Sequence, residues 1–147
     1  MKDPSADRVR AHTAPIVNRR LDEAAMRRVA QYSTASEAEI TRRIEELDRE
    51  WDTERVLEMN ASALALSGVV SAMVSNRKWL IVPSVVLPFL FLHAVQGWCP
   101  PLPVLRRLGF RTRKEIDAEK YALKAMRGDF RNVTAESGTA ALVAARQ

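Results

Sequence analysis

Two long runs without a charged side chain constrain this sequence more than any other feature. Residues 59–76 form one run of 18 residues and residues 79–105 form a second of 27, with only Arg77 and Lys78 between them. A bilayer core about 30 Å thick is crossed by roughly 20 helical residues. The pattern predicts an all-α membrane protein, in which a two-helix transmembrane hairpin is flanked by cytoplasmic amphipathic helices.

The second run predicts a membrane helix over residues 79–98, bounded by Trp79 and Trp98. These two indole rings are separated by roughly 28 Å along a helix, so that each can lie at a membrane interface. Pro83 and Pro88 predict a bend within this helix. We expect the helix to end at the prolines that follow it, which are Pro100, Pro101 and Pro103.

The first run predicts a membrane helix over residues 59–76, with small residues along one face. They recur at spacings of 4, 3, 4 and 3: Ala61, Ala65, Gly68, Ala72 and Ser75. Small residues allow membrane helices to approach closely. We therefore expect bulky side chains of the second membrane helix to pack along this face, with a tight turn at residues 76–78 and the hairpin spanning residues 59–105. A buried hairpin of a soluble bundle is the alternative, disfavoured because residues 79–105 lack a polar face.

An even number of spans places both termini on one side of the membrane. More basic residues flank the hairpin than lie in its turn, and Arg106 and Arg107 follow it closely. Cytoplasmic loops carry the excess of Lys and Arg, so both termini are expected to be cytoplasmic. Trp79, Trp98 and these two arginines are the predicted membrane-interface residues. Residues 1–30 contain no apolar core typical of a secretory signal.

The flanks are predicted to hold a flexible arm over residues 1–20 and cytoplasmic amphipathic helices over residues 21–58. Within the latter, Ser36 and Glu39 form a capping-box pattern that starts a helix. With no helix breaker before Ala61, this helix is expected to continue into the first membrane helix.

The segment after the hairpin, residues 106–131, holds nine basic and four acidic side chains. It predicts a basic juxtamembrane amphipathic helix, beginning at a second capping box, Thr112 and Glu115, and ending at Gly128. Such a helix either lies on anionic headgroups or is an ordinary solvated helix. Residues 132–147 are expected to form a flexible tail, with at most a short helix over residues 139–146.

Two polar residues lie one helical turn apart within the second membrane helix, His93 and Gln96. Polar groups at membrane depth are candidates for function because hydrocarbon offers them no partner. We expect hydrogen bonds to Ser67 or Ser71 on the facing helix, in preference to a haem or metal ligand role. The sequence accordingly predicts no metal and no cofactor.

Cys99 is the single cysteine, which excludes an intrachain disulfide and a site of several thiolates. Arg106 and Arg107 follow it closely, and nearby cations lower the pKa of a thiol and favour the reactive thiolate. A sulfur-relay or redox thiol is one interpretation of Cys99, and a small interfacial residue held by the proline turn is the other. The sequence has no catalytic triad spacing, glycine-rich phosphate loop or nucleic-acid-binding motif, and indicates neither an enzyme nor a nucleic-acid partner.

Two short motifs carry a family resemblance: Gly97-Trp98-Cys99-Pro100-Pro101 and Arg106-Arg107-Leu108-Gly109. With the hairpin before them, they resemble the YgaP-like inner-membrane domain of bacteria, a family largely without assigned function. The resemblance covers residues 58–109 and implies the hairpin fold and a bacterial inner-membrane location. Some members are fused to a sulfur-transferring rhodanese domain, which this sequence lacks, so sulfur transfer is not implied.

These observations predict a non-enzymatic accessory or scaffold protein of the membrane. Its small-residue face would dock against a second copy, giving a homo-oligomer, or against a larger membrane complex. The alternative is a membrane-surface sulfur-relay or redox protein acting through Cys99.

Overall fold

The computed structural model describes residues 7–131, 133 and 138–146, and each regular element in these ranges is a helix, as predicted. The described chain divides into two compact units. The hairpin unit comprises residues 7–19 and 51–113. The charged-helix unit comprises residues 20–50 and 114–146. The predictions for residues 1–6, 132, 134–137 and 147 lie outside the described residues.

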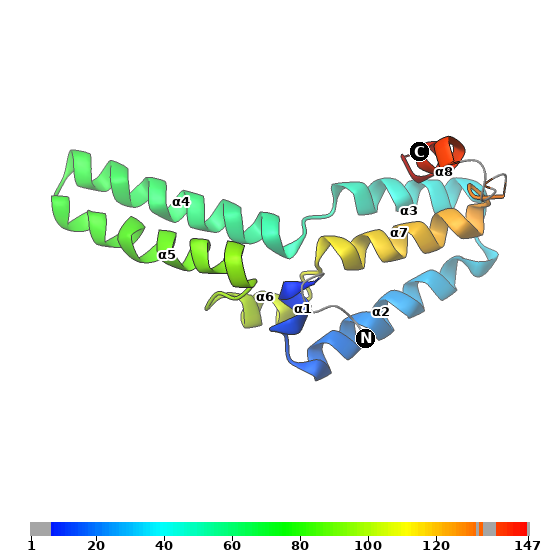
Figure 1. The fold of residues 1–147 in the computed structure, drawn as a ribbon, viewed down its shortest axis with the longest axis horizontal. Helices are drawn as coiled ribbons and strands as arrows, with labels where there is room; N and C mark the ends of the chain where they lie inside the picture. Colours follow the sequence, from blue (N-terminus) through cyan, green and yellow to red (C-terminus); the bar gives the residue numbers. More distant parts are fainter. Residues whose placement is uncertain (1–6, 132, 134–137, 147) are drawn as a thin grey trace. The chain divides into compact units, whose positions relative to one another are not determined.

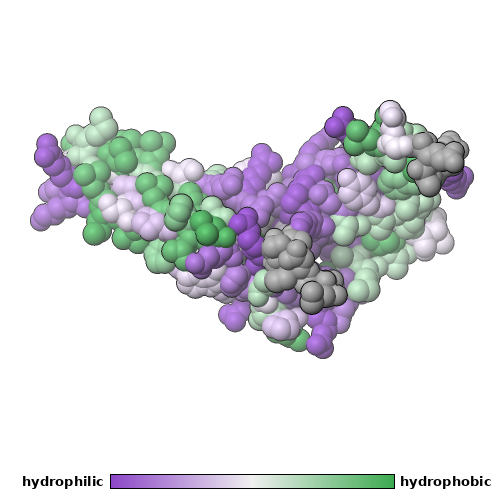
Figure 2. Space-filling view, in the orientation of Figure 1, coloured by the Kyte–Doolittle hydropathy of each residue, from purple (hydrophilic) through white to green (hydrophobic). Residues whose placement is uncertain are grey.

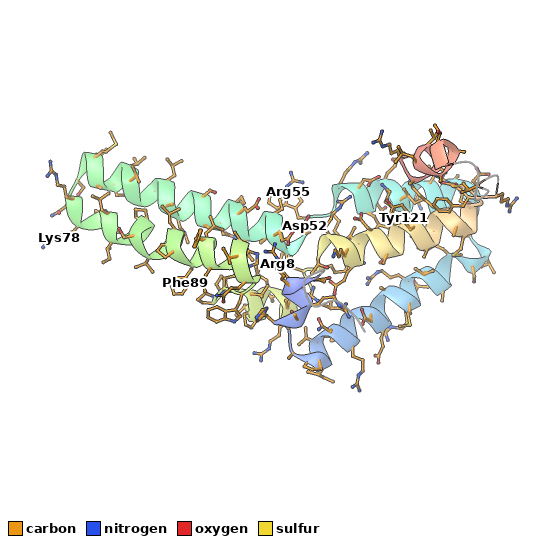
Figure 3. All side chains as sticks on the ribbon, in the orientation of Figure 1. Arg8, Asp52, Arg55, Lys78, Phe89 and Tyr121 are labelled. Carbon is orange, nitrogen blue, oxygen red and sulfur yellow. The ribbon has the colours of Figure 1, made fainter. Side chains whose placement is uncertain are left out.

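The hairpin unit is built on two helices that run side by side in opposite directions, α4 (Thr53–Val74) and α5 (Ile81–Gln96) (Figure 1). The 3-10 helix η3 (Arg77–Leu80) joins them. Its first turn is stabilised by the Asn76 side chain, which accepts a hydrogen bond from the backbone N–H of Lys78 at 2.9 Å. The predicted turn at residues 76–78 is therefore confirmed, and Lys78 marks it in Figure 3.

The predicted continuity between the cytoplasmic helix and the first membrane helix is wrong. Helix α3 (Glu37–Arg49) ends where Glu50 adopts an extended conformation, and α4 begins only at Thr53. Asp52 caps α4, because its carboxylate accepts a hydrogen bond from the Arg55 backbone N–H at 2.8 Å (Figure 3). Thr53 then donates from both its N–H and its Oγ1 to the Arg111 carbonyl.

The end of α5 is set by a glycine, whereas the prolines that follow open another helix. Gly97 adopts a left-handed conformation with φ of 77°, and its N–H donates to the His93 carbonyl at 2.7 Å. Pro101 is the N-cap of α6 (Leu102–Leu108) and Pro103 lies in its first turn. Proline is tolerated there because the first N–H groups of a helix have no intrahelical partner. Pro83 and Pro88 both lie within α5, which continues past them.

The expected flexible arm is helical over its described part. Helices α1 (Arg8–Ala11) and α2 (Pro15–Gln31) occupy it, and Asp7 caps α1. Val9 is buried in an apolar cluster of the hairpin unit, with Leu57, Cys99 and Leu102. Burial of the apolar Val9 side chain stabilises this segment. No periodic pattern in the sequence predicted this burial.

Arg8 fixes α1 against the end of α5. Its Nη1 donates hydrogen bonds to the carbonyls of Ala94 and Val95, whose acceptors are left free at a helix C-terminus. The Arg8 backbone passes so close to Gly97 that a Cβ there would overlap it.

Gly97→Ala is therefore expected to destabilise the hairpin unit by more than Gly109→Ala. Both glycines have positive φ, at 77° and 103°, so each substitution imposes similar backbone strain, about 1 kcal/mol. Only Gly97 also meets Arg8, whereas a Cβ at Gly109 has no described atom within 4 Å. Thermal unfolding of both variants in detergent measures the difference, and equal midpoints would contradict the contact between Arg8 and Gly97.

The charged-helix unit contains residues of α2, α3 and α7 (Arg113–Arg127), with α8 (Gly138–Arg146). Its core is apolar and comprises Ile40, Ile44, Leu47, Ile116 and Leu123. The predicted capping box is confirmed, since Ser36 N–H donates to the Glu39 carboxylate at 2.8 Å and Glu39 N–H to Ser36 Oγ at 3.4 Å. Helix α7 ends before Gly128, as predicted, and α8 matches the short helix expected in the tail.

A buried carboxylate links three helices of this unit. Glu119 of α7 has a fully buried side chain and accepts from Arg28 of α2 at 3.0 Å and from Arg43 of α3 at 2.9 Å. A buried carboxylate requires such partners to offset its loss of water.

Part of the basic charge of residues 106–131 is paired within the chain. The segment holds parts of two helices, α6 and α7, rather than one. Lys120 pairs with Asp48, Lys124 is buried and donates to the Ala145 carbonyl, and Arg127 pairs with Asp129. These three cations therefore have partners within the chain, whereas Arg107, Lys114 and Arg131 of the same segment are exposed.

Two helical stretches are long and apolar enough, by length and composition, to cross a membrane. One ends at Val74 and the other covers Arg77–Gln96. Figure 2 shows green, apolar atoms along α4 and α5, with purple atoms at the turn between them. Large apolar side chains of these two stretches that are exposed include Leu66, Met73, Val74, Ile81, Leu87 and Phe91.

Candidate functional site

The small-residue face of α4 packs inside the hairpin. Gly68 is buried, and a Cβ there would lie 2.6 Å from Pro83 Cδ and 2.9 Å from Val82 Cβ. Ala61, Ala65 and Ala72 are half-buried. Ser75 is exposed beside the turn. The close approach that the spacing predicted is thus made with α5 of the same chain.

A partly open cleft of about 420 Å³ lies at the opposite end of the hairpin from its turn. The two long helices supply most of its walls, and the segment after α5 supplies the rest. Its lining is Leu57, Asn60, Ala61, Leu64, Val85, Val86, Phe89, Leu90, His93, Cys99, Pro100, Pro101 and Leu105. The lining is predominantly apolar, which is typical of small-molecule sites.

His93 contributes an imidazole to this cleft. Its side chain is 8% exposed, and its Nδ1 is buried without a hydrogen-bond partner among the described residues. Unsatisfied buried polar atoms are rare in folded proteins because each costs about 1–3 kcal/mol. His93 therefore has one ring nitrogen that is buried without a hydrogen-bond partner among the described residues.

The expected hydrogen bonds from His93 to Ser67 or Ser71 are wrong. Gly68 lies opposite Val82 and Pro83, so the antiparallel register places His93 against the start of α4, beside Leu57 and Asn60. Ser67 instead donates to the Leu64 carbonyl of its own helix at 2.8 Å. The serines lie too far along α4 to reach the imidazole.

Gln96 does not join His93 as a buried polar residue. Its side chain is exposed, although it lies only one turn further along α5. Trp79 and Trp98 are also exposed, at 50% and 37%, near the two ends of the second apolar stretch. Of the two polar residues expected at membrane depth, only His93 faces the interior of the hairpin unit.

Cys99 is buried among apolar side chains at the edge of the cleft. It is 4% exposed and packs with Val9, Leu57 and Leu102. Burial raises the pKa of its thiol, because an apolar surrounding disfavours the thiolate. The lowered pKa expected for a reactive cysteine is therefore wrong.

Arg106 donates its hydrogen bonds to acceptors other than the Cys99 thiol. Its buried guanidinium donates to Thr13 Oγ1 at 3.2 Å, to Asn18 Oδ1 at 3.0 Å and to the Phe110 carbonyl at 3.0 Å. It was predicted as an interfacial residue, but it is 1% exposed and joins segments far apart in the sequence. Arg107, the other predicted interfacial arginine, is exposed.

Two structural contacts were not predicted from the sequence. Arg8 and Arg106 both donate hydrogen bonds to backbone or hydroxyl acceptors of distant segments, and an arginine in a charged flank gives no local signal of such a partner.

The part of the chain that the structure describes contains no group of three or more His, Cys, Asp or Glu side chains able to hold a metal ion.

Comparison of the chain with known protein families, with characterised proteins and with solved structures gave no match. The fold defines an all-helical protein with two candidate membrane-spanning helices and an apolar cleft between them. The resemblance to the YgaP-like family stays a prediction.

Proposed function

We propose that the chain is an integral membrane protein and acts as a non-enzymatic accessory or scaffold subunit. The observation that carries this proposal is the outward-facing apolar surface of α4 and α5. Met73 and Val74 are each 82% exposed and Phe91 is 70% exposed. Contiguous apolar surface of this kind is unfavourable in water and favourable in a bilayer.

The internal packing of the hairpin supports a pre-assembled membrane anchor. Gly68 lies against α5, so the close contact that stabilises membrane helices is already made within the chain. Association with a second copy or with a larger membrane complex then uses the outer faces of the hairpin or the charged-helix unit. The latter has its own apolar core and its own ion pairs, so it forms a folded body outside the hairpin.

Membrane orientation follows from the charges. The antiparallel arrangement of α4 and α5 brings Thr53 and Gln96 to the same side of the hairpin, opposite to Arg77 and Lys78. With the larger number of basic residues outside the hairpin, we propose two spans with both termini in the cytoplasm. The family resemblance supports the inner membrane of a bacterium.

The alternative function, sulfur relay or redox chemistry at Cys99, is not favoured. Catalytic thiols are usually accessible and have lowered pKa values. Cys99 is buried, and burial raises its pKa.

Labelling with a membrane-impermeant maleimide tests the proposed topology. In a Cys99→Ser background, Ser75→Cys lies beside the hairpin turn and Ser36→Cys precedes α3. We expect labelling of intact cells at position 75 alone, and labelling at both positions once the cells are opened. Labelling of position 36 in intact cells, or recovery of the chain in the soluble fraction after alkaline carbonate extraction, would overturn the proposal.

Purification of the tagged native chain in mild detergent tests the accessory role. We expect either a stoichiometric membrane complex or a defined homo-oligomer, identified by mass spectrometry and by the mass of the particle. A monomer without partners would contradict the scaffold function.

A further inference from the structure

Helix α6 has one face packed on the hairpin unit and one face exposed. Leu102, at the start of the helix, is fully buried and packs with Leu57 of α4, and Arg106 is buried as well. Val104 and Leu108 are instead 56% and 71% exposed. Residues four apart lie on the same side of a helix, so these two apolar side chains form one outward face of α6.

The contact with Leu57 fixes the height of α6 along the hairpin. Helix α6 contacts α4, and Leu102 packs with Leu57 near the start of α4. The large exposed apolar side chains of α4 begin at Met59, two residues further along. Two helical residues correspond to about 3 Å. Helix α6 therefore lies at the level where the outward apolar surface of the hairpin begins, at the end opposite the turn (Figure 1).

The neighbouring side chains are of the kinds found where a membrane meets water. Trp98, between α5 and α6, is 37% exposed, and indole rings are enriched at the level of lipid headgroups. Arg107 is exposed and makes no hydrogen bond or ion pair with the described residues. A guanidinium group binds phosphate through paired, charge-assisted hydrogen bonds. The outward side of α6 thus combines apolar side chains with a cation suited to a phospholipid.

We propose that the outward face of α6 lies in the headgroup layer of the bilayer that the hairpin spans. Val104 and Leu108 contact the upper part of the acyl chains, and Arg107 binds lipid phosphate. Continuity selects lipid as the occupant, because α6 adjoins the outward apolar surface of α4 and α5 that the same bilayer covers. Amphipathic helices at such a boundary lie along the interface. This inference rests on the proposed membrane insertion and adds a further element that meets the bilayer.

Spin labels on single cysteines measure the depth of this face. The full-length chain, in the Cys99→Ser background, is reconstituted in nanodiscs of phosphatidylcholine and phosphatidylglycerol. Val104→Cys and Leu108→Cys carry the test labels. Oxygen concentrates in hydrocarbon and a water-soluble nickel chelate is excluded from it, so the ratio of the two collision rates rises with depth.

Two further labels provide the references. Met73→Cys reports the outward surface of the hairpin, where Met73 is 82% exposed. Ala38→Cys reports water, since Ala38 of α3 is exposed between the exposed Glu37 and Glu39. We expect the oxygen-to-nickel ratio at positions 104 and 108 to be severalfold above the ratio at position 38 and below that at position 73.

The references separate the outcomes. Values at positions 104 and 108 equal to that at position 38, with a lipid-like value at position 73, would overturn the interfacial position of α6 while membrane insertion stands. A water-like value at position 73 as well would overturn the insertion itself. Labels at positions 104 and 108 shielded from both reagents would indicate a contact between copies of the chain and would also overturn the proposal.

Arg107→Glu tests the contact with phosphate. A carboxylate is repelled by lipid phosphates, so the ratio at positions 104 and 108 should fall severalfold while that at position 73 stays unchanged. Arg42→Glu is the matched control, because Arg42 is an exposed arginine of α3, and it should leave all the ratios as they are. Unchanged ratios in Arg107→Glu would overturn the assigned role of Arg107.

The native chain provides a measurement without any substitution. Phosphatidylcholine with a photoreactive diazirine close to its glycerol backbone is included in the nanodiscs, and the crosslinked peptides are identified by mass spectrometry. We expect crosslinks within residues 98–108 as well as within α5. Crosslinks in α5 without any in residues 98–108 would overturn the proposal.

Discussion

Gly68→Leu is expected to force α4 and α5 apart and to lower the thermal unfolding midpoint of the hairpin unit sharply. The first added carbon already lies 2.6 Å from Pro83 Cδ and 2.9 Å from Val82 Cβ, inside van der Waals contact. Pro83 has a rigid ring, so it has no side-chain rotation by which to withdraw. Overpacking a closely packed site costs about 1–3 kcal/mol per modest enlargement, and a leucine adds four carbons.

Two further variants isolate the cause. Gly68→Ala adds only the first carbon and should destabilise the hairpin by about 1–3 kcal/mol. Ala63→Leu enlarges an exposed position of the same helix and should leave the free energy of unfolding within about 0.5 kcal/mol of the native value. Circular dichroism melts in one detergent compare all three variants with the native chain. A midpoint for Gly68→Leu equal to that for Ala63→Leu would contradict the packing of α4 on α5.

The particle mass of Gly68→Leu in detergent distinguishes destabilisation of the single chain from loss of contacts between copies. Because the small-residue face lies inside the hairpin, Gly68→Leu is expected to act first on the fold of the single chain. If the variant kept the native melting midpoint but lost oligomers, the small-residue face would instead be a contact between copies, which is the docking role that the sequence also indicated.

Glu119→Gln is expected to destabilise the charged-helix unit by about 3 kcal/mol. The carboxylate is fully buried and lies 3.0 Å from Arg28 Nε and 2.9 Å from Arg43 Nη2. The amide keeps the size of the side chain but removes its negative charge, so that two guanidinium groups share a buried site with a neutral partner. Removing one member of a buried ion pair typically costs about 3–5 kcal/mol, because the remaining charge stays desolvated.

Glu46→Gln is the matched control, because Glu46 also binds Arg43, at 3.1 Å, while its side chain is 54% exposed. Exposed ion pairs are worth about 0–1 kcal/mol, so this variant should be close to native. Hydrogen exchange of the α3 and α7 amides in the full-length chain reports both effects. Equal protection of these amides from exchange in the two variants would show that burial of Glu119 does not determine its contribution to the stability of the unit.

Local patterns in the sequence were sufficient for the elements whose causes are local. The two uncharged runs predicted α4 and α5, and the turn at residues 76–78 followed from the charges between them. The capping box at Ser36 and the stop at Gly128 were also correct. In each case the determining contacts lie within one helical turn, where residue spacing is direct evidence of structure.

The register of the hairpin depended on more distant contacts. Small-residue spacing predicted a close-packing face on α4 with the second apolar helix against it, but not which residues of α5 lie opposite Gly68. Likewise, His93 was recognisable as a polar residue in an apolar run, whereas its position opposite Leu57 and Asn60 required the pairing of the two helices. A helix face is defined by local geometry, while its partner is chosen by the packing of the whole unit.

The charged flanks show most clearly the difference between what local sequence determines and what tertiary packing determines. The sequence by itself determined the helical class, the apolar hairpin and the charge of each segment. Only the tertiary structure decided that Arg8 binds the end of α5 and that Glu119 forms ion pairs with Arg28 and Arg43. It also decided that Cys99 is buried, which raises the pKa of its thiol. The physical reason is that desolvation and charge pairing depend on which distant side chains meet in space, and composition and spacing along the chain contain no measure of that distance.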